Sequence, residues 1–203
     1  MSRNALTALV AAVPIAIVLT GLTGLGAGAG PSRADAVSLK RKVSSIAEFS
    51  ARPTKQPLRT TVTENEVNAY LTFDALDQLP AGVVEPAITI VGPGRLTGRA
   101  VVDLDAVRKQ RSRTMMDPMN LATGRLPVTA TGLLTTGNGV GRFQLESASL
   151  GPLPIPKVLL QEIVGFYTRT PENPAGIGLD DPFALPARIR EIQVEPGRAI
   201  VVQ

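Results

Sequence analysis

The sequence predicts an α+β fold in which hairpin-connected antiparallel strands pack on two long helices. Three observations lead to this class: a capped helix pattern at 63–79, two alternating runs joined by Gly137-Asn138-Gly139, and an apolar helix pattern after residue 156. Strands that follow one another in hairpins form antiparallel sheets, and separate helices then cover one face of the sheet.

The first 36 residues indicate an export signal or a membrane anchor. Arg3 precedes an apolar run over 5–25, and the small-residue pattern A-x-A follows at Ala27 and again at Ala34. A basic start, an apolar run and such a site are typical of a secretory signal. About 20 apolar residues are also enough to span a bilayer as an uncleaved anchor. Both alternatives stay open, and both place the folded part in the periplasm or on the extracytoplasmic face of the inner membrane.

Residues 37–60 predict a short basic juxtamembrane helix followed by a linker. Apolar residues recur near helical spacing, Lys40, Arg41 and Lys42 stand between them, and two prolines then break the pattern. The three basic side chains are candidates for contact with anionic lipid at a membrane surface. The alternative, a solvated tether, stays open.

A single α+β domain is expected over 61–203, and its first helix begins at Thr63. Thr63 and Glu66 form the Thr-x-x-Glu pattern of a capping box, so the acids at this end are interpreted as caps. The apolar positions that follow, Tyr70, Leu71 and Phe73 among them, form one broad side of the helix.

The stretch 95–105 alternates with period two, which predicts a half-buried strand. One face carries small and aliphatic residues, Val102 among them, and the other carries Asp103 and Asp105. The run 128–134 repeats the small apolar face, so the sheet has room for a ligand beside it.

Turn residues predict two hairpins in the second half of the chain. The first joins the runs on either side of 137–139, and its return strand carries Phe143 on the apolar face. The second closes the chain and turns at Pro196-Gly197.

Three prolines between 152 and 156 lead into an apolar helix predicted from about Lys157 to Thr168. Its apolar side chains form two adjacent rows: Leu159, Ile163 and Phe166, and Leu160, Val164 and Tyr167. A surface helix requires one apolar stripe, and this helix has more. Either a second element covers it, or part of it faces a lipid-like ligand.

Composition argues against several kinds of site. The chain has no histidine and no cysteine, its aromatic content is 3%, and its net charge is +4. These values disfavour thiolate chemistry, a serine triad and a nucleic-acid platform, and we expect no cofactor, no metal and no catalytic residue. The pairs Asp103/Asp105 and Asp180/Asp181 leave a carboxylate-based hydrolase as a less favoured alternative.

The order of these patterns resembles that of a known group of proteins. "VTENEVNAYL", then alternating strands, then "SLGPLPIPKVLLQEIV" and a terminal hairpin resemble uncharacterised exported bacterial proteins of the YpmS-like kind. The layout, over roughly 63–202, is also similar to half of a tubular lipid-binding (TULIP-like) module. That resemblance implies a curved sheet wrapped on a long helix around a lipid groove.

We therefore expect a non-enzymatic cell-envelope protein that binds or shuttles an apolar ligand, a lipid above all. The ligand-binding side chains are expected from the helices and from the strands: Tyr70, Leu71, Phe73, Val102, Phe143, Leu159, Ile163, Phe166 and Tyr167. The alternative is an envelope interaction module that docks a protein partner with its apolar helix or an edge strand.

Overall fold

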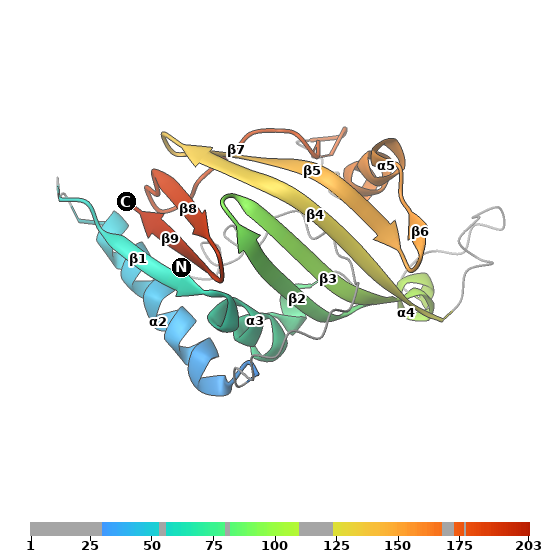
Figure 1. Cartoon of the computed structure of the whole chain (residues 1–203), viewed down its shortest axis with the longest axis horizontal. Helices are drawn as coiled ribbons and strands as arrows, with labels where there is room; N and C mark the ends of the chain where they lie inside the picture. The colour runs from blue at the N-terminus through green and yellow to red at the C-terminus, as the bar shows by residue number, and fades with distance from the viewer. Residues whose placement is uncertain (1–29, 53–55, 80–81, 110–123, 168–172, 177) are drawn as a thin grey trace.

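A computed structural model describes residues 30–52, 56–79, 82–109, 124–167, 173–176 and 178–203, with the backbone alone at 107–109, 163, 166 and 167. The helices are α2 (Arg33–Ser50), α3 (Glu64–Phe73), the 3-10 turn η1 (Leu76–Gln78), α4 (Leu104–Lys109) and α5 (Lys157–Tyr167). The strands are β1 (Arg59–Thr63), β2 (Val83–Gly92), β3 (Arg95–Asp103), β4 (Arg125–Gly137), β5 (Val140–Leu150), β6 (Leu153–Pro154), β7 (Phe183–Ala184), β8 (Glu191–Glu195) and β9 (Arg198–Val202). The predicted α+β class is confirmed (Figure 1).

The larger sheet has the strand order β2-β3-β4-β5-β6, with β7 paired to the start of β5, and all its pairs are antiparallel. The long β4–β5 hairpin turns at Asn138 and Gly139, whose φ angles are 52° and 78°. A two-residue hairpin turn requires such left-handed backbone, which Asn and Gly adopt most easily. The predicted hairpin is confirmed.

The smaller sheet has the order β1-β9-β8, and its β8–β9 hairpin turns at Pro196-Gly197 as predicted. Side chain and backbone bonds join it to the larger sheet. The Thr136 hydroxyl lies 2.7 Å from the backbone nitrogen of Ile192 and 2.9 Å from its carbonyl oxygen. The Gly197 N–H donates to the Ile90 carbonyl over 2.9 Å.

Helix α3 begins at the predicted capping box. The Thr63 hydroxyl accepts from the Glu66 N–H at 3.3 Å, and the Glu66 carboxylate accepts from the Thr63 N–H at 2.8 Å. The helix ends at Phe73, although the sequence predicts it to continue to about residue 79. Asp74 leaves helical geometry with φ −128°, so the chain continues as the separate turn η1.

Helix α2 packs into the folded body, whereas the sequence predicts a juxtamembrane helix outside the domain. Leu39, Val43 and Ile46 are buried in one cluster with residues of α3 and the smaller sheet. On the same side of α2, Ser38 and Lys42 bond the buried Glu66 carboxylate at 2.6 Å each.

The pKa of Glu66 makes this junction sensitive to acid. Burial raises the pKa, but bonds from Lys42, Ser38 and the Thr63 N–H lower it, and the net pKa lies below 4.5. A lowered pKa stabilises the fold above the unfolded-state pKa, and this stability is lost as the pH falls through the folded-state value. We expect the free energy of unfolding to fall from about pH 5 to about pH 3.

Urea unfolding of native protein and of Glu66→Gln across that range measures the contribution. The glutamine variant is expected to be less stable at pH 6 and to have a shallower pH dependence than the native chain. Equal slopes would contradict the assignment of the acid sensitivity to Glu66. Asp103→Asn is the comparison variant, because Asp103 also has a lowered pKa and its loss should reduce the slope as well. The assignment requires that Glu66→Gln, which removes the buried carboxylate, reduces the slope more.

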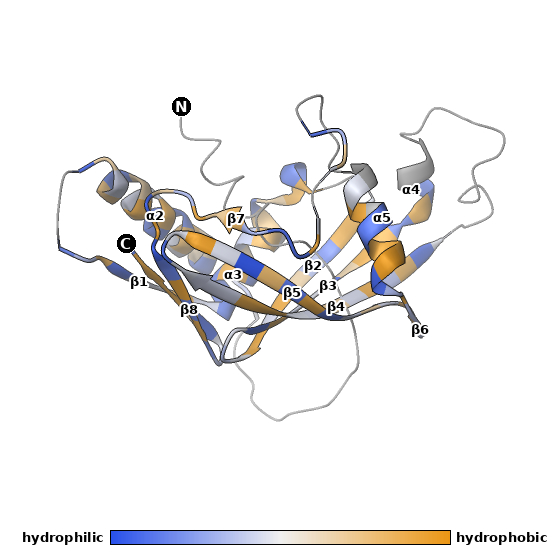
Figure 2. Ribbon diagram, turned by 90° about the horizontal axis from the view of Figure 1, so that it is seen from above, coloured by the Kyte–Doolittle hydropathy of each residue, from blue (hydrophilic) through white to orange (hydrophobic). Residues whose placement is uncertain are grey.

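The hydrophobic core consists of two clusters that share Ile88, Phe183 and Ile192. One lies between α2, α3 and the smaller sheet. The other lies between α5 and one face of the larger sheet, called here the inner face. Figure 2 shows α4 and α5 on this same side of the sheet, with apolar residues along the strands beneath them.

The predicted export signal or anchor, residues 1–36, falls mainly outside the described residues. Its second A-x-A pattern, at Ala34, forms the first turn of α2, and Ala36 is buried there. Among the described residues, no helix has both the length and the apolar composition needed to cross a membrane.

Candidate apolar binding site

The inner face is defined by side chains in register across four strands. Near the smaller sheet these side chains are fully buried: Ile90, Leu96, Ala130, Leu134, Phe143 and Leu145. The Phe143 ring lies over Gly132, where an added Cβ would sit only 2.3 Å from the ring. The room that the small residues of 128–134 predict is therefore filled by protein at this end.

The other half of the inner face, called here the open half, remains partly exposed. Its partly exposed side chains are those of Val102, Leu126, Val128 and Leu150 on β3, β4 and β5, and the small Ala100 among them is buried. Val102 is opposite Leu126, and Val128 is opposite Leu150, so the four side chains share one face. They form an aliphatic surface on strands that are not at the sheet edge, and water reaches part of it.

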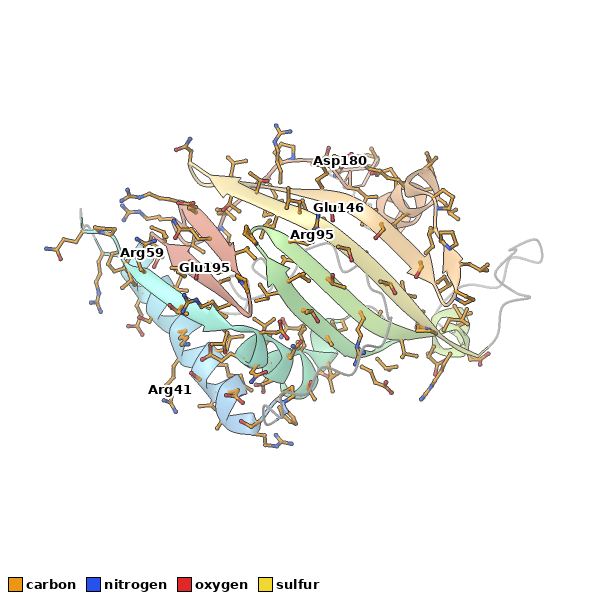
Figure 3. All side chains as sticks on the ribbon, viewed as in Figure 1. Arg41, Arg59, Arg95, Glu146, Asp180 and Glu195 are labelled. Atoms are coloured by element: carbon orange, nitrogen blue, oxygen red, sulfur yellow. The ribbon has the colours of Figure 1, made fainter. Side chains whose placement is uncertain are left out.

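The outer face of the same strands carries most of the sheet's polar and charged side chains, although it also includes Val101. The Thr97 and Thr131 hydroxyls bond each other across β3 and β4 at 3.0 Å. Arg95 pairs with Glu146 at 2.8 Å, and Figure 3 shows the two side chains between β3 and β5. An antiparallel sheet commonly has one solvated polar face, so the aliphatic open half is the unusual surface.

Leu153 extends the open half to the sheet edge. It lies opposite Leu150 in the β5–β6 register, so it belongs to the inner face, and its side chain is 67% exposed. Sequence reasoning named Val102 but missed Leu126, Val128, Leu150 and Leu153 as site residues. The alternating pattern identifies the face, but the exposure depends on which elements cover it.

Helix α5 lies over β5 and presents apolar residues on two sides. Leu160 and Val164 pack against the inner face, whereas Val158 is 75% and Leu159 is 53% exposed. Within the described residues, no second element sandwiches this part of the helix. The exposed apolar side confirms that α5 has more than one apolar stripe. The predicted site side chains of Ile163, Phe166 and Tyr167 lie outside the described residues.

Two bonds hold α5 in place from the loop that follows it. Lys157 pairs with Asp180 at 2.6 Å, and the Gln161 amide oxygen accepts from the Leu179 N–H at 2.7 Å. Leu179 is itself buried in the inner-face cluster. The helix is thereby fixed at its first two turns.

The predicted ligand-binding residues of the first helix lie in the other cluster. Tyr70 and Leu71 are buried between α2, α3 and the smaller sheet, and Gln78 donates to the Tyr70 hydroxyl at 3.1 Å. Phe73 is half-buried, with the Arg33 guanidinium 4.9 Å from the centre of its ring. These three side chains pack in the helical part of the fold and not on the inner face.

The predicted membrane-surface residues have different surroundings. Lys40 pairs with Asp74 at 2.6 Å, and Lys42 pairs with Glu66 at 2.6 Å. Arg41 is exposed, and Figure 3 shows it extending away from α2. Two of the three charges are thus engaged within the protein, and the membrane contact of this set stays a prediction.

The predicted strand face shared by Asp103 and Asp105 is not formed. The strand ends at Asp103, whose carboxylate accepts from the Ala106 N–H at 3.0 Å and from Arg125 at 3.3 Å, while Asp105 lies in α4. The Ala106 N–H, followed by the Arg125 guanidinium, holds the pKa of Asp103 below its usual value. Because the strand ends at Asp103 and the next residues form α4, the two carboxylates do not lie on one face of a strand.

The other acid pair also has structural partners. Asp180 pairs with Lys157, and Asp181 accepts from the Gly178 N–H at 2.7 Å. Within the described part of the chain, no three acidic side chains gather closely enough to hold a metal ion. The acids named as hydrolase candidates therefore stabilise turns, a helix start and ion pairs.

Comparison with known proteins gives little for this chain. No family model and no curated protein matches it. A solved structure described as "Crystal structure of lipopolysaccharide binding protein" is 18% identical over 72% of this chain and 40% of that chain, with a TM-score of 0.21. This chain spans less than half of that protein, and so low a score supports no argument. The resemblance to YpmS-like and TULIP-like proteins stays a prediction.

Proposed function

We propose that the protein is a non-enzymatic cell-envelope protein that binds an apolar ligand of the lipid class on the open half of the inner face. The observation that carries the proposal is the partial exposure of Val102, Leu126, Val128 and Leu150 on β3, β4 and β5. These positions belong to the face that elsewhere forms the core.

Exposed aliphatic surface of this kind favours an apolar ligand on energetic grounds. Each square ångström of apolar surface that a ligand removes from water contributes roughly 25 cal/mol to the free energy of binding. An acyl chain laid across Val128 and Leu150 would complete the burial that Phe143 and Leu134 have at the other end. The four partly exposed side chains of the open half are all aliphatic, so they suit contact with an acyl chain better than with a polar substrate.

Two further features support the remaining parts of the proposal. The apolar run at 5–25 supports export to the envelope. The non-enzymatic character is supported by Asp103, Asp180 and Asp181, each of which bonds a backbone N–H or an ion-pair partner.

The test uses an anthroyloxy-labelled fatty acid, whose emission rises in apolar surroundings, and the full chain in detergent-free buffer. Val102→Thr with Val128→Thr keeps side-chain shape but puts two hydroxyls on the open half. An unpartnered hydroxyl in apolar contact costs about 1–3 kcal/mol. The affinity for the fatty acid is therefore expected to fall about tenfold or more.

The matched control is Val84→Thr with Val101→Thr. These two residues are opposite each other on the outer face of β2 and β3, and they are also partly exposed. The control is expected to bind the probe like the native chain. Equal losses in both variants, or no binding by the native chain, would refute the proposal.

A further inference from the structure

We propose that the corner between β6 and α5, residues 151–159, enters the surface of a lipid bilayer. Exposed apolar side chains are concentrated here. Of the seven large hydrophobic residues exposed among the described residues, Leu153, Val158 and Leu159 lie within this corner, and the other four are spread over the chain. Apolar residues scattered singly on a surface require no explanation, but a cluster marks an interaction site.

The charge of the corner suits a membrane surface. From Gly151 to Leu159 the only charged residue is Lys157, and the segment has no acid. Lysine next to apolar residues lets the apolar side chains enter the interface while the ammonium stays among the headgroups. Asp180, on the loop after α5, pairs with Lys157 at 2.6 Å, so the corner presents apolar side chains beside one neutralised ion pair and no net negative charge.

The backbone of the corner also suits an apolar medium. A backbone N–H that leaves water without a partner is unfavourable in lipid. Pro152, Pro154 and Pro156 have no N–H. The Gly151 N–H donates to Pro127 over 2.6 Å, and the Ile155 N–H donates to Ala148 over 2.8 Å. Five of the nine residues of the corner thus present no free donor.

The same prolines argue against a protein strand as the occupant. β6 is at the edge of the larger sheet, where a partner chain adds a strand by bonding free N–H and C=O groups. Pro154 lacks the donor that such pairing needs. Three side chains are also far fewer than the roughly 20–30 residues per partner of a stable protein interface. A bilayer requires neither pairing nor a large complementary area.

The corner is continuous with the open half. Leu153 lies opposite Leu150, which lies opposite Val128, so one row of apolar side chains runs from the sheet edge onto the open half. This inference rests on the proposed function, because docking at this edge gives a lipid a path between the bilayer and the open half.

The experiment labels single cysteines, which the native sequence lacks, in the full chain. Val158→Cys and, as the control, Val91→Cys each carry an environment-sensitive NBD group. Val91 is 51% exposed near the end of β2, whereas Val158 is 75% exposed in the corner. Each labelled protein is mixed with vesicles of phosphatidylcholine and phosphatidylglycerol, with or without doxyl lipids that quench within the bilayer.

On vesicles, the label at 158 is expected to shift to shorter wavelength and to be quenched by doxyl lipids, and the label at 91 is expected to do neither. Adding Leu153→Ser and Leu159→Ser should abolish both changes at 158. No change at 158, or the same change at both sites, would overturn the inference. So would a dimer in ultracentrifugation that these serines dissociate, because the occupant would then be a second copy.

The fatty-acid probe separates this inference from the proposed function. Binding in solution without bilayer insertion overturns the docking corner alone. If the native chain does not bind the fatty acid, the proposed function is refuted, whatever the label at 158 reports.

Discussion

Phe143→Ala is expected to lower the free energy of unfolding by about 3–5 kcal/mol and to leave fatty-acid binding unchanged. Truncation of a buried phenylalanine loses apolar contact and leaves a cavity that the surroundings fill only in part. Phe143 is 4% exposed, and its ring occupies the space above Gly132. The neighbours cannot close this space easily, because Gly132 has no side chain to extend into it.

This result would assign Phe143 to the filled half of the inner face and not to the ligand site that the sequence predicts. Urea unfolding measures the loss of stability, and titration with the fatty acid measures binding in the same preparation. Phe73→Ala is the matched control. Because Phe73 is only half-buried, this truncation should lower the free energy of unfolding by clearly less. Weaker binding with little loss of stability would show instead that Phe143 contacts the ligand.

Local signals account for the parts of the fold that the sequence predicted well. The capping box at Thr63, the turn at Asn138-Gly139 and the turn at Pro196-Gly197 each depend on residues within three or four positions of one another. Their geometry is set by backbone preference and short-range hydrogen bonds, so one sequence is enough to find them.

Contacts between distant segments explain what the sequence did not predict. The basic residues Lys40 and Lys42 appear free in the sequence, but their partners Asp74 and Glu66 lie 34 and 24 residues away. The burial of α2 depends on the same junction. A run of basic residues predicts a solvated surface, and only the folded structure shows that acids lie opposite two of them.

The sequence predicts which face of the sheet carries the candidate site, but not which part of that face stays exposed. Alternation identifies the inner face, and Val102 was expected to contact the ligand. The sequence does not show that Phe143 fills the room above Gly132, that Leu150 remains partly exposed, or that Leu153 is exposed. These outcomes depend on where α5 and the smaller sheet lie on the larger sheet.

Asn68→Leu is expected to lower the free energy of unfolding by about 2–4 kcal/mol, because Asn68 satisfies the backbone at the β2 edge of the larger sheet. The Asn68 side chain bonds both backbone groups of Ile88. Its amide nitrogen donates to the Ile88 carbonyl over 2.8 Å, and its oxygen accepts from the Ile88 N–H over 2.7 Å. One side chain thus replaces the neighbouring strand that β2 lacks on this side.

The next backbone pair along the same edge is satisfied in a similar way. Glu64 accepts from the Ile90 N–H at 2.7 Å, and the Gly197 N–H donates to the Ile90 carbonyl at 2.9 Å. Helix α3 and the smaller sheet therefore close the edge of β2 against pairing with another chain. Leucine at 68 has the same branching and number of side-chain heavy atoms as asparagine but none of its polar atoms. It therefore leaves two partly buried backbone groups without partners, each at about 1–2 kcal/mol.

Urea unfolding of three variants separates this contribution from a general effect on α3. Asn65→Leu is the matched control, because Asn65 is exposed on the same helix, and it should change stability by less than about 0.5 kcal/mol. Asn68→Asp keeps the acceptor for the Ile88 N–H but loses the donor to its carbonyl, so it should fall between the two leucine variants. If Asn68→Leu proved no less stable than Asn65→Leu, the side chain would not be what holds the edge. The edge of β2 would then be held by the bonds of Ile90 to Glu64 and Gly197 and by the packing of Ile88, which contributes to both core clusters.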